Sequence, residues 1–136
     1  MFGLQIKYLS FFFGLISILS FFNIIYSYYF NLYLNLDTYY LSLFLSSILA
    51  ILFYILKISP KKTSIFQKIL TVFLGYILLP LVLSIPFYLS IYNLTFINSF
   101  FEAVSGFTST GFSIFENVKN IDQSLILWRS TTQWIG

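Results

Sequence analysis

Residues Phe100–Ser113 read FFEAVSGFTSTGFS, a short apolar run followed by a segment of Ser, Thr and Gly. The apolar run predicts a short helix, and the small polar residues predict a loop after it. The stretch lies between one long hydrophobic segment and the start of another. In a membrane protein, non-helical backbone at bilayer depth is tolerated only where protein or a water-filled cavity covers it. The stretch therefore predicts a pore loop, whose backbone carbonyl groups replace the hydration shell of a cation.

The composition indicates an integral membrane protein. Of the 136 residues, 59% are hydrophobic and 8% are charged, and the mean hydropathy is +0.90. A soluble domain of this size cannot bury so much apolar surface. The chain has no cysteine and no histidine, which excludes disulfides, thiolate chemistry and the usual zinc ligands. The net charge of +3 is concentrated in one loop, so it indicates membrane orientation and not nucleic-acid binding.

Two hydrophobic runs at the start of the chain predict a transmembrane hairpin over residues 1–58. The run Tyr8–Tyr29 has no charge, and at about 1.5 Å per residue it is about 33 Å long, enough to cross a bilayer. It is too long for a signal peptide, so we expect it to be retained. The second run, Tyr39–Ile58, predicts a crossing in the opposite direction.

Small residues recur at helical spacing in both runs, and such ridges let two membrane helices approach closely. The first ridge consists of Ser10, Gly14, Ser17 and Ser20, and the second of Ser42, Ser46 and Ala50. Alternatively, the serines bond only to the backbone of their own helix. Tyrosines gather around the connection between the runs and predict an interfacial belt: Tyr26, Tyr28, Tyr29, Tyr33, Tyr39 and Tyr40.

Basic residues set the predicted orientation. Four of the seven lie together without an acidic residue among them: Lys57, Lys61, Lys62 and Lys68. The positive-inside rule places this basic loop, residues 59–68 around Pro60, in the cytoplasm. The amino terminus with Lys7 is then also cytoplasmic, and the connection Asn31–Thr38 faces outward.

The remainder, residues 69–136, predicts one pore repeat. Ile69–Ile91 is the third crossing, with kinks expected at Pro80 and Pro86. The pore helix runs from Ser99 to Ser105 or Gly106, about two turns, with Thr95 or Asn98 as its cap. After the filter loop, Ile114–Gln123 forms an external loop. Ser124–Gly136 starts a fourth helix, but its length of roughly 20 Å is too short to cross the bilayer, so we expect a piece of a longer polypeptide.

The predicted fold is thus an all-α membrane protein with two leading helices and one membrane-pore-membrane repeat. The stretch FFEAVSGFTSTGFS resembles the first pore loop of the Trk/Ktr/HKT superfamily of potassium transporters. The later stretch LILWRSTTQWIG resembles the motif that opens the next helix in that family, and PFYLSIYNLTFINSFFEAVSG resembles the end of the outer helix leading into the loop. Two helices before the first repeat are typical of the membrane subunit of the Trk potassium-uptake system.

The resemblance implies four repeats around a potassium path, with Gly111 as the filter glycine of the first repeat. Backbone carbonyl groups of four residues then line one quarter of the filter and bind potassium: Thr108, Ser109, Thr110 and Gly111. Three residues support the filter from behind: Glu102, Ser105 and Gly106. Three more match the opening of the next helix: Arg129, Gln133 and Trp134. The chain departs from the family pattern at Ser109, where threonine is common, and at Phe112, where a small residue is common.

The resemblance also implies partners and a location. They are the potassium ion as transported substrate, the lipid bilayer, a second copy in a homodimer and a cytosolic nucleotide-binding regulatory subunit, with no cofactor and no nucleic acid. The location is the inner membrane of a bacterium. Two other functions are open on the residues alone, a small homo-oligomeric pore-loop channel and a non-conducting helical scaffold. An enzyme is not expected, because no acid pairs with a base at helical spacing inside a crossing.

Single residues near the loop also have alternative interpretations. Glu102 either supports the filter or complements the positive end of its own helix. Arg129 lies near the outer end of its segment and is interpreted as an interfacial anchor, with an ion gate as the alternative. Trp128 and Trp134 are interpreted as belt or packing residues.

Overall fold

The computed structural model describes residues 6–56, 64–117 and 120–136, and these residues form helices and connecting loops without a strand. The helices are, in chain order, α1 (Ile6–Tyr29), α2 (Leu36–Ile55), α3 (Ile65–Leu83), α4 (Ile85–Tyr88), α5 (Phe96–Phe107) and α6 (Gln123–Ile135). The prediction of an all-helical chain is therefore confirmed over this part of the sequence. Lys57, Lys61, Lys62 and Pro60 lie outside the described residues, as does Lys119.

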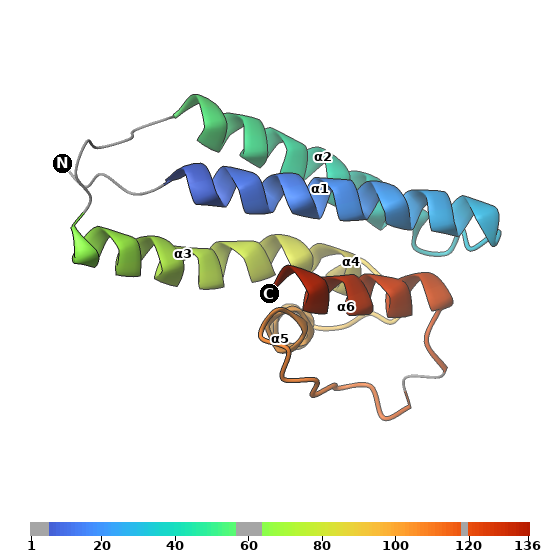
Figure 1. The fold of residues 1–136 in the computed structure, drawn as a ribbon. Helices are drawn as coiled ribbons and strands as arrows, with labels where there is room; N and C mark the ends of the chain where they lie inside the picture. The colour runs from blue at the N-terminus through green and yellow to red at the C-terminus, as the bar shows by residue number, and fades with distance from the viewer. Residues whose placement is uncertain (1–5, 57–63, 118–119) are drawn as a thin grey trace.

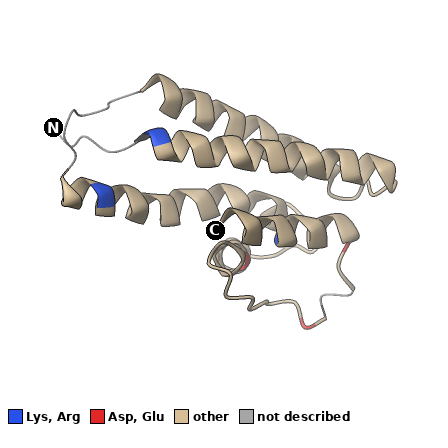
Figure 2. Cartoon of the chain, viewed as in Figure 1, with Lys and Arg blue, Asp and Glu red and all other residues tan. Residues whose placement is uncertain are grey.

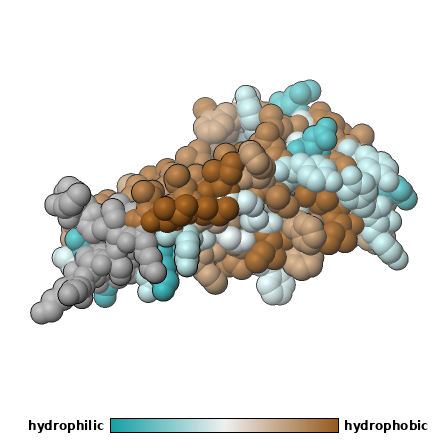
Figure 3. Space-filling model, turned by 90° about the horizontal axis from the view of Figure 1, so that it is seen from above, coloured by the Kyte–Doolittle hydropathy of each residue, from teal (hydrophilic) through white to brown (hydrophobic). Residues whose placement is uncertain are grey.

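Three segments are long and apolar enough to cross a membrane: Lys7–Tyr29, Leu36–Ile55 and Ile65–Tyr88, the last combining α3 and α4. Large apolar side chains such as Phe11, Phe44 and Phe73 lie on the outside of these helices. Hydrophobic residues cover much of the middle of the molecule, and most hydrophilic ones gather toward the end that carries the α1–α2 turn (Figure 3). The chain is thus built as a multi-pass membrane protein.

The third crossing starts earlier than its hydrophobic run indicates. It was expected from Ile69, but α3 starts at Ile65, so Lys68 belongs to the first turn of the helix and not to a loop. The backbone N–H of Ser64 donates to Oε1 of Gln67 at 3.1 Å, which closes a capping box at this point. Likewise α2 starts at Leu36 and not at Tyr39, with Asp37 in its first turn.

Helices α1 and α2 pack along a seam of serines, so the prediction that the two small-residue ridges face each other is confirmed. Ser10 Oγ donates to the carbonyl oxygen of Ala50 at 2.8 Å, and Ser20 Oγ lies 3.3 Å from Ser42 Oγ. Ser17 Oγ pairs with Ser47 Oγ at 2.7 Å. Ser20 Oγ also donates to the carbonyl of Ile16 in its own helix. Ser20 therefore both contacts the neighbouring helix and bonds to its own backbone, as the two interpretations of these serines proposed.

Gly14 was predicted to belong to this close contact, and that prediction is wrong. A Cβ atom added at Gly14 would meet no atom within 4 Å. The serine hydroxyls therefore hold the two helices together, and the helices do not come closest at the glycine.

The break between α3 and α4 occurs at Ser84, just before Pro86. Pro86 has no N–H to continue the helical hydrogen bonds. The carbonyl oxygen of Leu83 accepts a hydrogen bond from the indole N–H of Trp128 on α6, at 3.1 Å. Trp128 is fully buried and is a packing residue, whereas Trp134 is 88% exposed.

Helix α5 lies across the direction of the long helices. In Figure 1, α1, α2, α3 and α6 run across the picture, while α5 is seen down its axis, level with the middle of α1. It packs against α3, α4 and α6. The helix is longer than the two turns predicted, because Thr95 caps it and accepts from the N–H of Asn98 at 3.3 Å. After α5 the chain runs toward the end of the bundle that carries the α1–α2 turn, and α6 starts there (Figure 1).

The predicted tyrosine belt is right in part. Tyr28, Tyr29, Tyr33 and Tyr40 are exposed, but Tyr39 is completely buried. The hydroxyl of Tyr39 lies 2.9 Å from Ser124 Oγ and its ring packs against Trp128. Tyr39 therefore connects α2 to α6 and is not a belt residue.

Charged residues are few and separated along the bundle. Lys7 and Lys68 lie in the first turns of α1 and α3, which start at the same end (Figure 2). Among the acidic residues of the described part, Glu116 and Asp122 lie on the loop that leads into α6.

The serine seam predicts that Ser42→Leu destabilises the protein. Ser42 is fully buried between α1 and α2, so a larger side chain forces the helices apart, at a cost of about 1–3 kcal/mol. Thermal unfolding of the detergent-solubilised protein measures the effect. Leu41→Val is the matched control because Leu41 faces outward on the same helix. Equal melting temperatures for the two variants would contradict the close packing.

Candidate functional site

The loop after α5 folds back over the carboxyl end of that helix. The N–H of Ser109 donates to the carbonyl of Gly106 at 2.9 Å, and the N–H of Thr110 donates to the carbonyl of Ser105 at 3.0 Å. Two residues adopt left-handed backbone angles, Ser109 with φ 54° and Gly111 with φ 80°. Glycine takes such angles without steric cost, which explains the residue type at position 111. Nothing in the sequence marked Ser109 for the same conformation.

Within the described residues, three of the four predicted filter carbonyl groups have no hydrogen-bond donor. Thr108, Ser109 and Thr110 are exposed, and no hydrogen-bond donor within the described ranges contacts their carbonyl oxygens. The hydroxyls of Thr108 and Thr110 pair with each other at 2.6 Å, and that of Thr108 also donates to the carbonyl of Val104. The carbonyl oxygen of Gly111 differs, because it accepts a hydrogen bond from Arg129 Nη2 at 3.2 Å.

Glu102 lies in the middle of α5 and is 0% exposed. Its Oε1 atom accepts two hydrogen bonds from the loop, from Ser113 Oγ at 2.7 Å and from the N–H of Ile114 at 2.6 Å. Its Oε2 atom forms an ion pair with Arg129 Nε at 3.0 Å. The interpretation that Glu102 complements the positive end of its helix is wrong, because the residue is far from that end. It lies instead behind the loop and contacts both the loop and α6.

Arg129 extends from α6 to the same loop. Its Nη2 atom donates to the carbonyl oxygens of Gly111 at 3.2 Å and Phe112 at 3.0 Å. Its side chain is 14% exposed. The interpretation of Arg129 as an interfacial anchor is therefore wrong. The sequence could not reveal the contact, because the partners come from a helix and a loop that only the fold brings next to α6.

Ser105 and Gly106 have separate contacts. Ser105 Oγ donates to the carbonyl of Phe112 at 2.6 Å, which attaches the loop to α5. Gly106 faces α6, where a Cβ atom added to it would overlap Oγ1 of Thr132. The small residue at position 106 thus permits the close approach of α5 and α6.

A second polar cluster fixes the start of α6. Asn35 Nδ2 donates to Asp122 Oδ2 at 3.2 Å, and Ser124 Oγ donates to the same oxygen. The hydroxyl of Tyr92 accepts from the N–H of Asp122 at 2.6 Å. Asn35 is buried, and it also accepts from the N–H of Ile91 at 3.3 Å. Sequence reasoning missed this cluster, although Asn35 and Asp122 each directly precede a helix and could have been recognised as cap positions.

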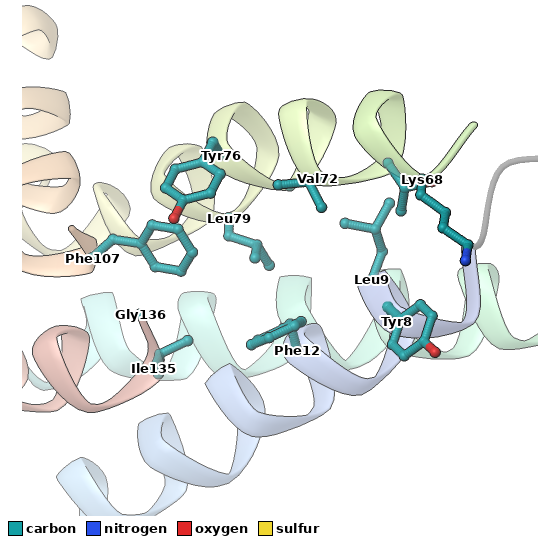
Figure 4. A pocket seen from close by; sticks show the side chains of 12 residues that line it. Tyr8, Leu9, Phe12, Lys68, Val72, Tyr76, Leu79, Phe107, Ile135 and Gly136 are labelled. Atoms are coloured by element: carbon teal, nitrogen blue, oxygen red, sulfur yellow. The ribbon is translucent and has the colours of Figure 1, made fainter. Parts of the chain in front are cut away.

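A groove of about 470 Å³ lies between α1 and α3. Figure 4 shows Lys68 and Tyr8 at one end and Tyr76 and Phe107 at the other, with apolar side chains between them. A cation site needs several oxygen ligands, and this lining is chiefly hydrophobic. In the described part of the chain, no group of three His, Cys, Asp or Glu residues could hold a metal ion. The loop after α5 is therefore the better candidate for a cation site.

Comparison with known proteins gives partial matches. The chain is 31% identical over 77 residues to an uncharacterized cation transporter of Methanocaldococcus jannaschii, covering 57% of this chain and 16% of that protein. It is 40% identical over 58 residues to the Trk system potassium uptake protein TrkI of Halomonas elongata, covering 43% of this chain and 11% of that protein. It is 41% identical over 44 residues to the Trk system potassium uptake protein TrkG of Escherichia coli, covering 32% of this chain and 9% of that protein.

The chain therefore spans less than a fifth of the length of each of these relatives. No family model matches it, and no solved structure does.

The contact at Gly106 predicts that Gly106→Ala destabilises the protein by about 1–3 kcal/mol, because the new methyl group overlaps Thr132. Gly14→Ala is the matched control, since its methyl group meets nothing, and we expect no loss of stability there. Thermal unfolding in detergent measures both. Adding Thr132→Ala to Gly106→Ala should recover part of the loss, and failure of this rescue would count against the contact.

Proposed function

This chain is a relative of the Trk potassium uptake proteins, and from that premise we propose that it belongs to the pore-forming membrane subunit of such an uptake system. Its substrate is then the potassium ion, and its role is passive coordination of the ion and not catalysis. In this proposal α3, α4, α5 and α6 form the first membrane-pore-membrane repeat, and α1 and α2 form a leading hairpin. Thr108, Ser109, Thr110 and Gly111 contribute one quarter of the filter.

One observation carries the proposal: three adjacent exposed residues, Thr108, Ser109 and Thr110, have carbonyl groups without a donor in the described part of the chain. Backbone carbonyl groups need a hydrogen-bond partner or another ligand, and on exposed residues that ligand is water or a cation. Rings of carbonyl groups that replace the hydration shell are how potassium filters work. Glu102 and Ser105 bond to the far end of the loop, which leaves these three groups free.

The arrangement of α5 also supports a loop that enters the membrane. The helix lies level with the middle of α1, whose length spans a bilayer, and crosswise to it (Figure 1). It contacts α3, α4 and α6, so protein covers it on several sides. Irregular backbone at membrane depth requires such cover.

The wider setting follows from the same premise. We propose a bacterial inner-membrane location with the amino terminus in the cytoplasm. The positive-inside rule supports this orientation, because Lys7 and Lys68 lie at the same end of the bundle. We also propose that the complete transporter is a homodimer and that it binds a cytosolic nucleotide-binding regulatory subunit.

Substitution of Gly111 tests the filter. Gly111 has φ 80°, and an added Cβ would meet no atom within 4 Å, so backbone strain and not lack of space opposes a side chain. Valine at this angle is strained by about 1–2 kcal/mol, whereas asparagine tolerates it. We expect Gly111→Val to abolish rubidium uptake in a strain that lacks its own potassium uptake.

Gly111→Asn is the matched control and should retain more transport, at equal protein abundance in the membrane. If Gly111→Val transports rubidium at the wild-type rate, the filter assignment fails.

The proposed orientation can be tested with single cysteines, because the chain has none of its own. Leu34→Cys and Glu116→Cys, both at exposed positions, should react with a membrane-impermeant maleimide in intact cells. Lys68→Cys should react only after permeabilisation. The reverse labelling pattern would show that the orientation is inverted.

A further inference from the structure

We propose that Arg129 is a positioning residue for the cation path, and that its forked contact keeps the loop selective for potassium over sodium. The inference rests on the proposed function and deepens it. It concerns residues 111–114, the part of the loop that follows the three free carbonyl groups.

The ion pair between Arg129 and Glu102 contacts every residue of this segment, and Ser105 adds hydrogen bonds to Gly111 and Phe112. Arg129 bonds to the carbonyl oxygens of Gly111 and Phe112, and Glu102 bonds to Ser113 Oγ and to the N–H of Ile114. Arg129 and Glu102 themselves form an ion pair, in which Nε of Arg129 lies 3.0 Å from Oε2 of Glu102. Each of the four consecutive residues thus has one contact to one of the two side chains.

The ion pair also connects the loop to fixed parts of the bundle. Arg129 lies about two turns along α6 from Asp122. The start of α6 is fixed to α2 by the bonds of Asp122 to Asn35 and of Ser124 to Tyr39. The position of the Gly111 peptide therefore depends on α6 through Arg129, and on α5 through the carbonyl oxygen of Ser105, which accepts from the N–H of Gly111 at 3.4 Å.

The geometry requires an arginine. Its planar guanidinium carries five donors in a fixed fork, so one side chain reaches a carboxylate and two carbonyl groups together. Lysine keeps the positive charge but presents it from a single nitrogen, which cannot occupy the positions of Nε and Nη2 at once. A comparison of arginine with lysine at position 129 therefore separates the effect of positioning the loop from the effect of the positive charge.

The pair is also suited to a filter of neutral groups. Glu102 is 0% exposed and its charge is compensated by Arg129, so the loop is held by charged side chains without gaining net charge. Discrimination between potassium and sodium depends on the number, field strength and mobility of the coordinating carbonyl groups. Loss of the contacts that hold residues 111–114 increases the mobility of the carbonyl groups. We therefore expect it to lower selectivity for potassium while transport itself continues.

The test is Arg129→Lys in the protein as its gene encodes it, expressed in cells that lack other potassium uptake. Initial rates of rubidium uptake are measured with and without competing sodium, together with the KM for potassium and the abundance of the protein in the membrane. We expect the preference for rubidium over sodium to fall about tenfold, the scale set by loss of one hydrogen bond to a charged group. Ser130→Ala is the matched control, because Ser130 is exposed and its one hydrogen bond to a described residue goes to the carbonyl of Ile126 on its own helix.

Glu102→Gln provides a second variant, to be measured also if Arg129→Lys does not reach the membrane. It should lower selectivity in the same direction, and Arg129→Lys added to it should cause little further change, because both act through one contact. Unchanged selectivity in Arg129→Lys at wild-type abundance overturns the inference, as do independent, multiplicative effects of the two substitutions. If Gly111→Val abolishes uptake while Arg129→Lys stays selective, only this inference fails. If both transport normally, the proposed function fails as well.

Discussion

The ion pair between Glu102 and Arg129 is the interaction on which the geometry of the loop depends. Burial of a carboxylate costs several kcal/mol unless hydrogen bonds and an opposite charge compensate it. Glu102 receives all of these, from Ser113, from the N–H of Ile114 and from Arg129. Because the carboxylate is compensated only when the loop and α6 are both in place, the pair couples the conformation of the loop to the packing of α5 against α6.

The rest of the bundle uses polar contacts in a similar way. Lipid is as apolar as the helix surfaces, so hydrophobic burial does little to associate helices within a bilayer. Here α1 and α2 are joined by serine hydroxyls, α2 and α6 by Tyr39 and Asn35, and α3 and α6 by the indole of Trp128. Each contact links segments distant in sequence, so together they specify how the helices are arranged while the apolar side chains face outward.

The sequence predicted those features that depend on one segment alone. The three crossings follow from the length of their apolar runs. Features that join two segments were not predictable: the burial of Tyr39 depends on α6, and the role of Arg129 depends on α5. The early start of α3 could have been found, since Ser64 and Gln67 have the spacing of a capping box. The assignment of the filter residues stays a prediction.

The exposure of the loop has a consequence for the proposed filter. Phe112 is 68% exposed, and no atom lies within 4 Å of a Cβ added at Gly111, so the outer side of the loop contacts nothing in the described part of the chain. Among the described residues, the hydrogen bonds that attach this loop to helices lead to α5 and α6. A loop held rigidly from behind and open in front can supply carbonyl groups to a ring, but it cannot define the diameter of that ring. In the proposed pore, the packing of this bundle against the other repeats therefore sets the diameter of the ring. Because the loop is attached to α5 and α6, this packing also sets the distance between the carbonyl groups and the ion.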